Sequence, residues 1–150
     1  MRAAIAEAES GVRENRGGPF GCVIVRRGEV IARGSNCVTS MNDPTAHAEI
    51  IAIRAACQQL GTYRLDECEL YTSCEPCPMC LAAIYWARMA RVYYGNTRDD
   101  AAAIGFDDAL IYDQIALAPP RRALEMKPLL RAEAQHTFQA WAAKSDKIEY

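Results

Sequence analysis

Residues 69–95, ELYTSCEPCPMCLAAIYWARMARVYYG, decide the fold of this chain. Residues 69–72 are typical of a strand, residues 78–89 of a helix that begins with proline, and residues 91–95 of a second strand. A strand, a helix and a strand in this order predict two parallel neighbouring strands joined by a crossover helix. We therefore expect an α/β fold.

The segments before this stretch continue the pattern. Residues 20–26 and 30–34 are apolar and β-branched on either side of a glycine turn, which predicts a hairpin. Residues 46–60 carry the strongest helical stripe in the chain and follow Asp43-Pro44-Thr45, a typical helix start. The sheet is thus expected to be mixed, with an antiparallel hairpin beside a parallel pair.

Helices are expected at both ends of the chain. Residues 2–16 and 129–143 have helical spacing, and residues 99–118 suggest short helical pieces. Residues 119–128 contain three prolines and have room for one short strand. Helices on both faces of a mixed sheet make a three-layer α/β/α sandwich the favoured architecture.

Composition limits the class of protein. The chain has 150 residues, 51% hydrophobic and 24% charged, a size that suits one domain over residues 1–150. A net charge of −2 disfavours the broad positive field that binds duplex DNA or tRNA. No apolar run approaches the roughly 20 residues that span a bilayer, and the first residues do not suit a signal peptide. We expect a cytoplasmic protein without a membrane partner, for which nucleic acid is an improbable ligand.

Cysteine and histidine spacing indicates a metal site. Seven cysteines, an odd number, favour metal ligation or burial over a set of disulfides. Cys77 and Cys80 lie three residues apart at an expected helix start, where the positive helix end favours thiolate. His47 lies near the start of the other strong helix. One imidazole and two thiolates leave a fourth position open, as in catalytic zinc sites, so we expect one Zn²⁺ per chain.

Glu49 is the expected proton carrier at this site. It follows His47 by two residues, and side chains in a first helical turn can both reach a site beyond the helix end. A carboxylate beside the open metal position can take a proton from water and return it to a substrate. Alternatives remain for single motifs: a redox or buried thiol pair, a capping histidine, or a structural zinc with Cys74 as fourth ligand. The two motifs together, about 30 residues apart, favour the catalytic zinc site.

These motifs resemble the cytidine deaminase superfamily of zinc-dependent amino-group hydrolases, and within it the bacterial guanine deaminases. Six stretches across the chain carry the resemblance. They are residues 43–50, residues 71–80, residues 84–88, Gly18-Pro19-Phe20-Gly21, Gly105-Phe106-Asp107-Asp108 and Ile148-Glu149-Tyr150. The resemblance implies a five-stranded sheet, zinc on the two thiolates and the imidazole, and the glutamate as proton carrier.

The resemblance also implies how a purine is held. It assigns substrate binding to Phe20, Asn36, Ala48, Trp86 and Phe106, and completion of the catalytic site to Asp108 and Tyr150. Other readings of these residues stay open: Asn36 can be a turn residue, the rings can belong to the core, and Asp107 can replace Asp108 as the carboxylate that faces the site. Glu75 is interpreted as an anion at a helix start and His136 as a surface residue.

The implied activity is hydrolytic deamination of guanine to xanthine and ammonia, with a small purine as partner. A related aminopurine, nucleoside or triazine deaminase is the enzyme alternative, and a tRNA adenosine deaminase would need a local basic patch. A zinc-stabilised binding module is the non-enzyme alternative, but such a module has no use for an unligated glutamate. The resemblance further implies that tail residues 144–150 close an active site through Tyr150, and tail burial favours a homodimer.

Overall fold

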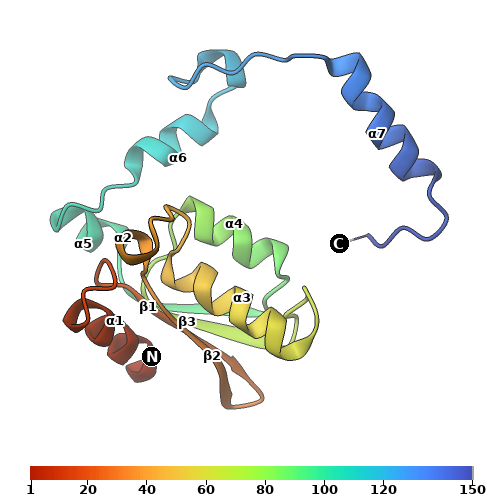
Figure 1. The fold of residues 1–150 in the computed structure, drawn as a ribbon. Helices are drawn as coiled ribbons and strands as arrows, with labels where there is room; N and C mark the ends of the chain where they lie inside the picture. Colours follow the sequence, from red (N-terminus) through yellow and green to blue (C-terminus); the bar gives the residue numbers. More distant parts are fainter. Residues whose placement is uncertain (150) are drawn as a thin grey trace. The chain divides into compact units, whose positions relative to one another are not determined.

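The computed structural model describes residues 1–149 of the chain. These residues form two compact units, Met1–Ala109 and a C-terminal unit that begins at Leu110 (Figure 1). The N-terminal unit contains the sheet and both metal-site motifs. Each unit is described by itself below.

A four-stranded mixed sheet forms the centre of the N-terminal unit. Its strands are β1 (Gly21–Arg26), β2 (Glu29–Ser35), β3 (Cys68–Cys74) and β4 (Arg91–Asn96), in the order β2-β1-β3-β4. The pairs β1–β2 and β1–β3 are antiparallel, whereas β3 and β4 are parallel and joined by α4 (Pro78–Trp86). The hairpin and the strand–helix–strand unit that the sequence predicts are confirmed.

The expectation of a fifth strand is wrong for the described residues. The stretch 119–128, where one short strand was possible, contains only the 3₁₀ helix Pro119–Arg121 and irregular backbone. Pro119, Pro120 and Pro128 lack the N–H group that a strand donates to its neighbour. This local chemistry outweighs the pattern, and the α/β class is unaffected.

Helices cover both faces of the sheet, which makes the expected three layers. The helix α1 (Arg2–Arg13) packs on one face, where a Cβ atom on Gly21 would lie 2.3 Å from the carbonyl oxygen of Ala4. The helix α3 (Ala48–Leu60) packs on the other, where a Cβ atom on Gly34 would lie 2.3 Å from the carbonyl oxygen of Ala48. Glycine at these two strand positions therefore permits close helix-to-sheet contact. Figure 1 shows α3 and α4 side by side.

The main core lies between the sheet and the α3–α4 layer. Its largest fully buried side chains include Ile24, Leu65 and Leu70, and the alanines of α3 pack on them. Truncation of such a leucine to alanine costs about 2–5 kcal/mol, since it removes apolar contacts and leaves a cavity. This packing fixes the position of the first turns of both helices, where the candidate site lies.

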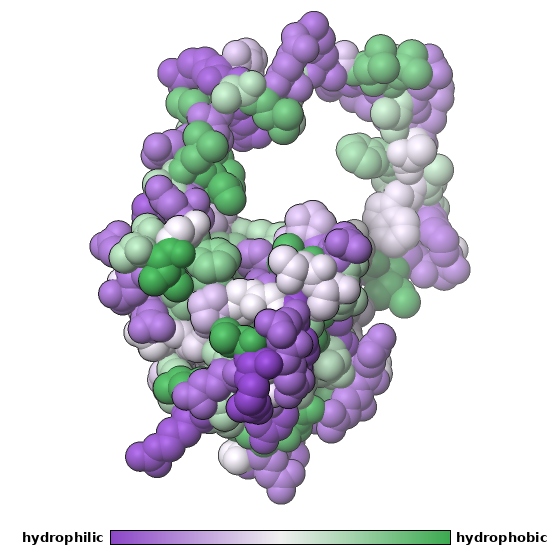
Figure 2. Space-filling view, turned by 60° about the vertical axis from the view of Figure 1, so that its left-hand side comes forward, coloured by the Kyte–Doolittle hydropathy of each residue, from purple (hydrophilic) through white to green (hydrophobic). Residues whose placement is uncertain are grey.

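Short helices complete both units. The helices α2 (Val38–Met41) and α5 (Arg98–Ala103) belong to the N-terminal unit. The helix α6 (Ala109–Ala116) begins at the last residue of that unit, and α7 (Arg131–Ala143) lies within the C-terminal unit. No residue from 110 to 149 is buried, and Figure 2 shows hydrophobic side chains at the surface of the C-terminal unit.

Candidate metal centre and active site

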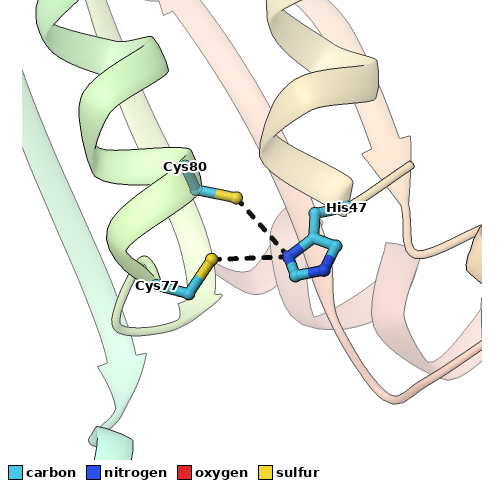
Figure 3. A group of neighbouring side chains, drawn as sticks. All are labelled: His47, Cys77 and Cys80. Carbon is cyan, nitrogen blue, oxygen red and sulfur yellow. Dashed lines mark hydrogen bonds between the residues drawn. The ribbon is translucent and has the colours of Figure 1, made fainter. Parts of the chain in front are cut away.

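Two helix starts place the histidine and the cysteines together. His47 precedes α3 as its N-cap residue and Cys77 precedes α4 in the same way, both with extended backbone (ψ 155° and 167°). The helix α3 thus begins at Ala48, two residues later than the sequence pattern predicts. Asp43 instead stabilises a turn, in which its side chain accepts hydrogen bonds from the backbone and hydroxyl of Thr45. This extended backbone turns the imidazole ring of His47 toward α4 (Figure 3).

The three candidate ligands have the spacing that zinc requires. The Nδ1 atom of His47 lies 3.6 Å from the Sγ atom of Cys77 and 3.6 Å from that of Cys80 (Figure 3). Bonds of about 2.3 Å to sulfur and about 2.0 Å to nitrogen, at tetrahedral angles, put S and N about 3.5 Å apart, close to the distance observed. The three ligand atoms all lie within 4.8 Å of one another. One borderline-soft ion therefore fits this group, with one coordination position left for another ligand.

The cysteines share their protons unequally in the metal-free chain. Hydrogen bonds that Cys80 and His47 donate to the thiolate lower the pKa of Cys77 to about 4. The adjacent Cys77 thiolate, together with burial, raises the pKa of Cys80 far above its ordinary value. The same thiolate raises the pKa of His47. Metal binding must displace the remaining protons, so affinity for the ion increases with pH.

Glu49 lies between the metal group and the sheet. The residue is 5% exposed, and its Oε1 atom accepts a hydrogen bond of 2.9 Å from the Thr72 hydroxyl on β3. Its Oε2 atom lies 3.4 Å from the Sγ atom of Cys80. Burial raises the pKa of Glu49, which brings this acid closer to the range in which it can both take and give a proton.

Asn36 is held near the same end of α3 by backbone groups. Its Oδ1 atom accepts hydrogen bonds from the backbone N–H groups of Gly18 (3.1 Å) and Val38 (3.2 Å). The next N–H group, that of Cys37, donates to the carbonyl oxygen of Ala46, which directly precedes His47. These bonds commit the amide oxygen to the protein and orient the amide NH₂ group as the remaining donor.

Two aromatic rings lie beside Asn36. Phe20 and Phe106 pack edge to face, with ring centroids 4.9 Å apart and an interplanar angle of 89°. A Cβ atom on Gly18 would lie 3.1 Å from both rings, so a glycine permits the rings and the Asn36 loop to meet. The Phe106 ring is 47% exposed, which leaves part of its surface for a flat ligand.

Comparison with known proteins agrees with this geometry. The sequence profile described as "Cytidine and deoxycytidylate deaminase zinc-binding region" matches residues 1–96, which include the three ligands and Glu49.

The chain belongs to the cytidine and deoxycytidylate deaminase family.

Similarity to one member of this deaminase family extends over the whole chain. The guanine deaminase of Bacillus subtilis is 51% identical over 150 residues, which cover all of this chain and 96% of the relative. The X-ray structure of that protein matches with a TM-score of 0.96 at 52% identity, over 99% of this chain and 95% of the other. The tRNA-specific adenosine deaminase of Agrobacterium fabrum is 50% identical over 105 residues, or 69% of this chain and 68% of the relative. The predicted resemblance is confirmed.

The two neighbouring aspartates, Asp107 and Asp108, lie in different environments. Asp107 is exposed, and its Oδ1 atom accepts a hydrogen bond of 2.8 Å from the backbone N–H of Ala109 at the start of α6. Asp108 is partly buried, which raises its pKa; Arg98 lowers it, and the Cys77 thiolate raises it further. Of the two carboxylates, Asp108 is thus the less exposed, and its place in the site remains a prediction.

Other candidate residues lie farther from the metal group or offer only backbone. Ala48 is fully buried, and Trp86 ends α4 with 62% of its surface exposed. Six residues separate Trp86 from Cys80, about 9 Å along the helix axis. Tyr150 lies outside the described residues, and the tail before it, 144–149, is exposed. The roles assigned to these residues therefore remain predictions.

A structural zinc site with Cys74 as fourth ligand is not supported by contacts in residues 1–149. Cys74 is absent from the group of possible ligands, and its thiol donates to the carbonyl oxygen of Thr97. His136 is exposed on α7, as expected. Glu75 does act at a helix start, but at that of α5, where its carboxylate accepts from the backbone N–H of Arg98. None of the helices in residues 1–149 is long and apolar enough to cross a membrane.

The sequence prediction missed Thr72, which donates to Glu49, and Gly18, which holds Asn36. The sequence did carry a signal for Thr72. It follows Leu70 by two residues on β3, and residues two apart on a strand share a face, which here is the inward one. A hydroxyl there needs a buried partner. Gly18 carried no comparable signal, because its contacts depend on a loop folded back onto the strand ends.

Proposed function

We propose that this chain hydrolyses guanine to xanthine and ammonia with the help of one zinc ion. The observation that supports this most strongly is the 51% identity to Bacillus subtilis guanine deaminase over the entire chain. The match to a tRNA-specific adenosine deaminase, by contrast, covers 69% of the chain. The catalytic ligands are common to the family, so the full-length similarity favours the smaller substrate.

In this proposal His47, Cys77 and Cys80 hold the zinc. Bound zinc supplies a Lewis acid that lowers the pKa of water at its open position. Glu49 takes a proton at Oε2, the oxygen on the side of the metal group, and delivers it to the ring nitrogen beside the carbon that carries the amine. The oxygen of that water forms a bond to the carbon that carries the amine. Glu49 then takes the remaining proton of the added hydroxyl group and passes it to the exocyclic nitrogen, so that the C–N bond breaks and ammonia leaves. One carboxylate thereby serves as both base and acid.

The purine is proposed to be held by one amide and a set of rings. The Asn36 NH₂ group donates to an acceptor of the base, because its oxygen is already bonded to backbone. The rings of Phe20 and Phe106 contact the flat face, Trp86 adds a further ring, and the Ala48 backbone offers polar atoms. Asp108 can accept a hydrogen bond from a purine N–H group. A flat, apolar surface with few polar groups is typical of such sites.

The C-terminal unit is proposed to act in assembly and closure. Residues 110–149 expose large apolar side chains, among them Leu124, Leu129 and Phe138, each at least 75% exposed. An apolar surface of this kind needs a partner, and a second copy of the chain is our proposal, as a homodimer in the cytoplasm. Residues 144–150 would then close an active site, with the ring and carboxylate of Tyr150 over the substrate. The whole of residues 1–150 would serve one catalytic function.

An ammonia-release assay tests the proposed function. The zinc-loaded protein is offered guanine, adenine, cytosine, guanosine and ammeline in parallel, with a tRNA anticodon stem as a further substrate. We expect the highest kcat/KM on guanine. Faster ammonia release from another base or from tRNA would identify that compound as the substrate in place of guanine. No release from any of them would contradict deaminase activity.

A further inference from the structure

We infer that Thr72 is a positioning residue, whose hydroxyl fixes the carboxylate of Glu49 so that one oxygen faces the metal group. The inference rests on the proposed function, since it assigns a task to a residue that supports the proton carrier. Thr72 does not touch the metal group in any hydrogen bond of the described residues.

Thr72 lies where the sheet would otherwise present an apolar side chain. It follows Cys68 and Leu70 on the same face of β3, and both of those side chains belong to the core under α3. Its cross-strand neighbour on β1, Cys22, is also fully buried in that core. A hydroxyl at such a place costs free energy unless it is hydrogen-bonded. Its partner here is the Glu49 carboxylate.

The hydrogen bond divides the two oxygens of Glu49 between the sheet and the site. Oε1 is 2.9 Å from the Oγ1 atom of Thr72, a residue that is 0% exposed. Oε2 is 3.4 Å from the Sγ atom of Cys80 and so lies beside the metal ligands. Rotation of the carboxylate would break the bond to a fully buried donor and leave that donor without a partner. The bond therefore holds Oε2 in the position from which it can move a proton.

The rigid strand strengthens this effect. The strand β3 is paired on both sides, with β1 and with β4, so the Thr72 backbone has little freedom to move. Misplacement of a catalytic group by about 1 Å can lower a rate by about a hundredfold. Loss of the hydroxyl should therefore reduce kcat more than it changes KM, because Thr72 is not placed in contact with substrate.

The test compares variants that separate the effect of the Thr72 hydroxyl from that of its methyl group. Thr72→Val keeps the shape and loses the hydroxyl, whereas Thr72→Ser keeps the hydroxyl and loses the methyl group. Thr72→Ala loses both and completes the set. We expect kcat on guanine to fall about ten- to a hundredfold in Thr72→Val, with KM within about threefold of wild type. Thr72→Ser should retain most of kcat, and Thr72→Ala should fall at least tenfold below Thr72→Ser.

Ser73→Ala provides the matched control on the same strand. The Ser73 hydroxyl is also buried, but it accepts a hydrogen bond of 3.0 Å from the Gly21 backbone on the face toward α1. Its loss should lower the unfolding midpoint and leave kcat unchanged. Zinc content, measured on every variant, should stay at one per chain. A loss of kcat in Thr72→Val at full zinc content is then explained by a misplaced Glu49 carboxylate and not by loss of folding.

Two results with the Thr72 variants would overturn the inference and leave the proposed function intact. One is a Thr72→Val enzyme, fully loaded with zinc, whose kcat lies within twofold of wild type. The other is equal kcat in Thr72→Ser and Thr72→Ala, a comparison that still decides the matter if Thr72→Val fails to fold. If the wild-type enzyme prefers another base, the ratios of kcat between variants and wild type are measured on that base. That result contradicts guanine as the substrate and leaves the role of Thr72 open to the same test. A zinc-loaded wild type that deaminates no base overturns both proposals.

Discussion

The helices α3 and α7 are both 13 residues long, yet they have opposite environments. The helix α3 in the N-terminal unit buries five residues, including Glu49, whereas α7 in the C-terminal unit buries none. Both have sequences that predict helix. The difference shows that helical pattern alone does not create a site: α3 lies on a sheet that desolvates its first turn, and α7 has no such surface within its own unit.

The same contrast applies to charged and apolar groups. The N-terminal unit can bury a carboxylate because Thr72 and the metal group satisfy it. In α7 the apolar Phe138 and Trp141 are 77% and 44% exposed. One unit thus offers a complete local environment for chemistry, and the other offers a surface that lacks a partner. The predictions below test this division.

Loss of a metal ligand should have the largest effect. Cys77→Ala or Cys80→Ala removes one of three ligands, so we expect zinc below about 0.1 per chain and no detectable deamination. Metal analysis and ammonia release measure both. Cys37→Ala, which removes a thiol outside the ligand group, is the control and should retain both. Full activity after exhaustive chelation would contradict the assignment of chemistry to this centre.

Glu49→Ala should separate zinc binding from turnover. General acid–base catalysis alone contributes roughly 10²–10⁴ in rate, and here one group is proposed to move two protons. We expect kcat to fall by at least that factor while zinc content remains near one per chain. A variant with more than a tenth of the wild-type rate would show that another group carries the protons.

Deletion of residues 147–150 tests whether the C-terminal unit takes part in catalysis. We expect zinc content and melting temperature to stay nearly unchanged, since residues 147–149 are exposed, while kcat/KM on guanine falls at least about tenfold.

A longer truncation, to residues 1–109, extends that test. It should still bind zinc and should sediment as a monomer, whereas we expect the full chain to sediment as a dimer. Unchanged kcat/KM after the short deletion would limit closure of the site to Asp108. A dimer of the truncated chain would contradict assembly through the C-terminal unit.

Phe106→Ala should have a smaller effect, confined to binding. Stacking of a base on an aromatic ring contributes about 1–3 kcal/mol, so KM for guanine should rise roughly 5- to 150-fold with little change in kcat. Phe106→Tyr keeps the ring and should retain most of the affinity. Steady-state kinetics on both variants measure KM and kcat for guanine. An unchanged KM in Phe106→Ala would show that the Phe20–Phe106 pair has only a structural role.

The smallest expected effect concerns stability and pH in the metal-free chain. Burial raises the pKa of Glu49 above its value in the unfolded chain, so the folded state binds more protons between the two values. This contribution to stability is fully present below the unfolded pKa and is lost as pH rises through the folded pKa. Glu49→Gln cannot ionise, so its unfolding midpoint in urea should exceed that of wild type at about pH 8.

The two metal-free proteins should approach each other at about pH 4, where the carboxyl is largely protonated in both states. Greater stability of wild type at pH 8 would mean that the buried carboxylate gains more from its neighbours than it loses on burial. The same comparison with zinc bound should show a higher midpoint for both proteins, because the ion binds only the folded chain.

The sequence by itself determined the metal ligands, the neighbouring acid and the strand–helix–strand unit. His47, Cys77 and Cys80 could be predicted because each lies in a short motif at a helix start, where local spacing controls which way side chains point. Only the tertiary structure decided that Thr72 contacts Glu49, that backbone groups orient the Asn36 amide, and that Asp108 is less exposed than Asp107. It also decided that residues 119–128 add no fifth strand. The contacts of Glu49 and Asn36 join segments far apart in the chain, so the sequence could indicate that Thr72 faces inward but not which group it contacts. The fifth strand is absent for a local reason, because Pro119, Pro120 and Pro128 lack the N–H groups that a strand donates.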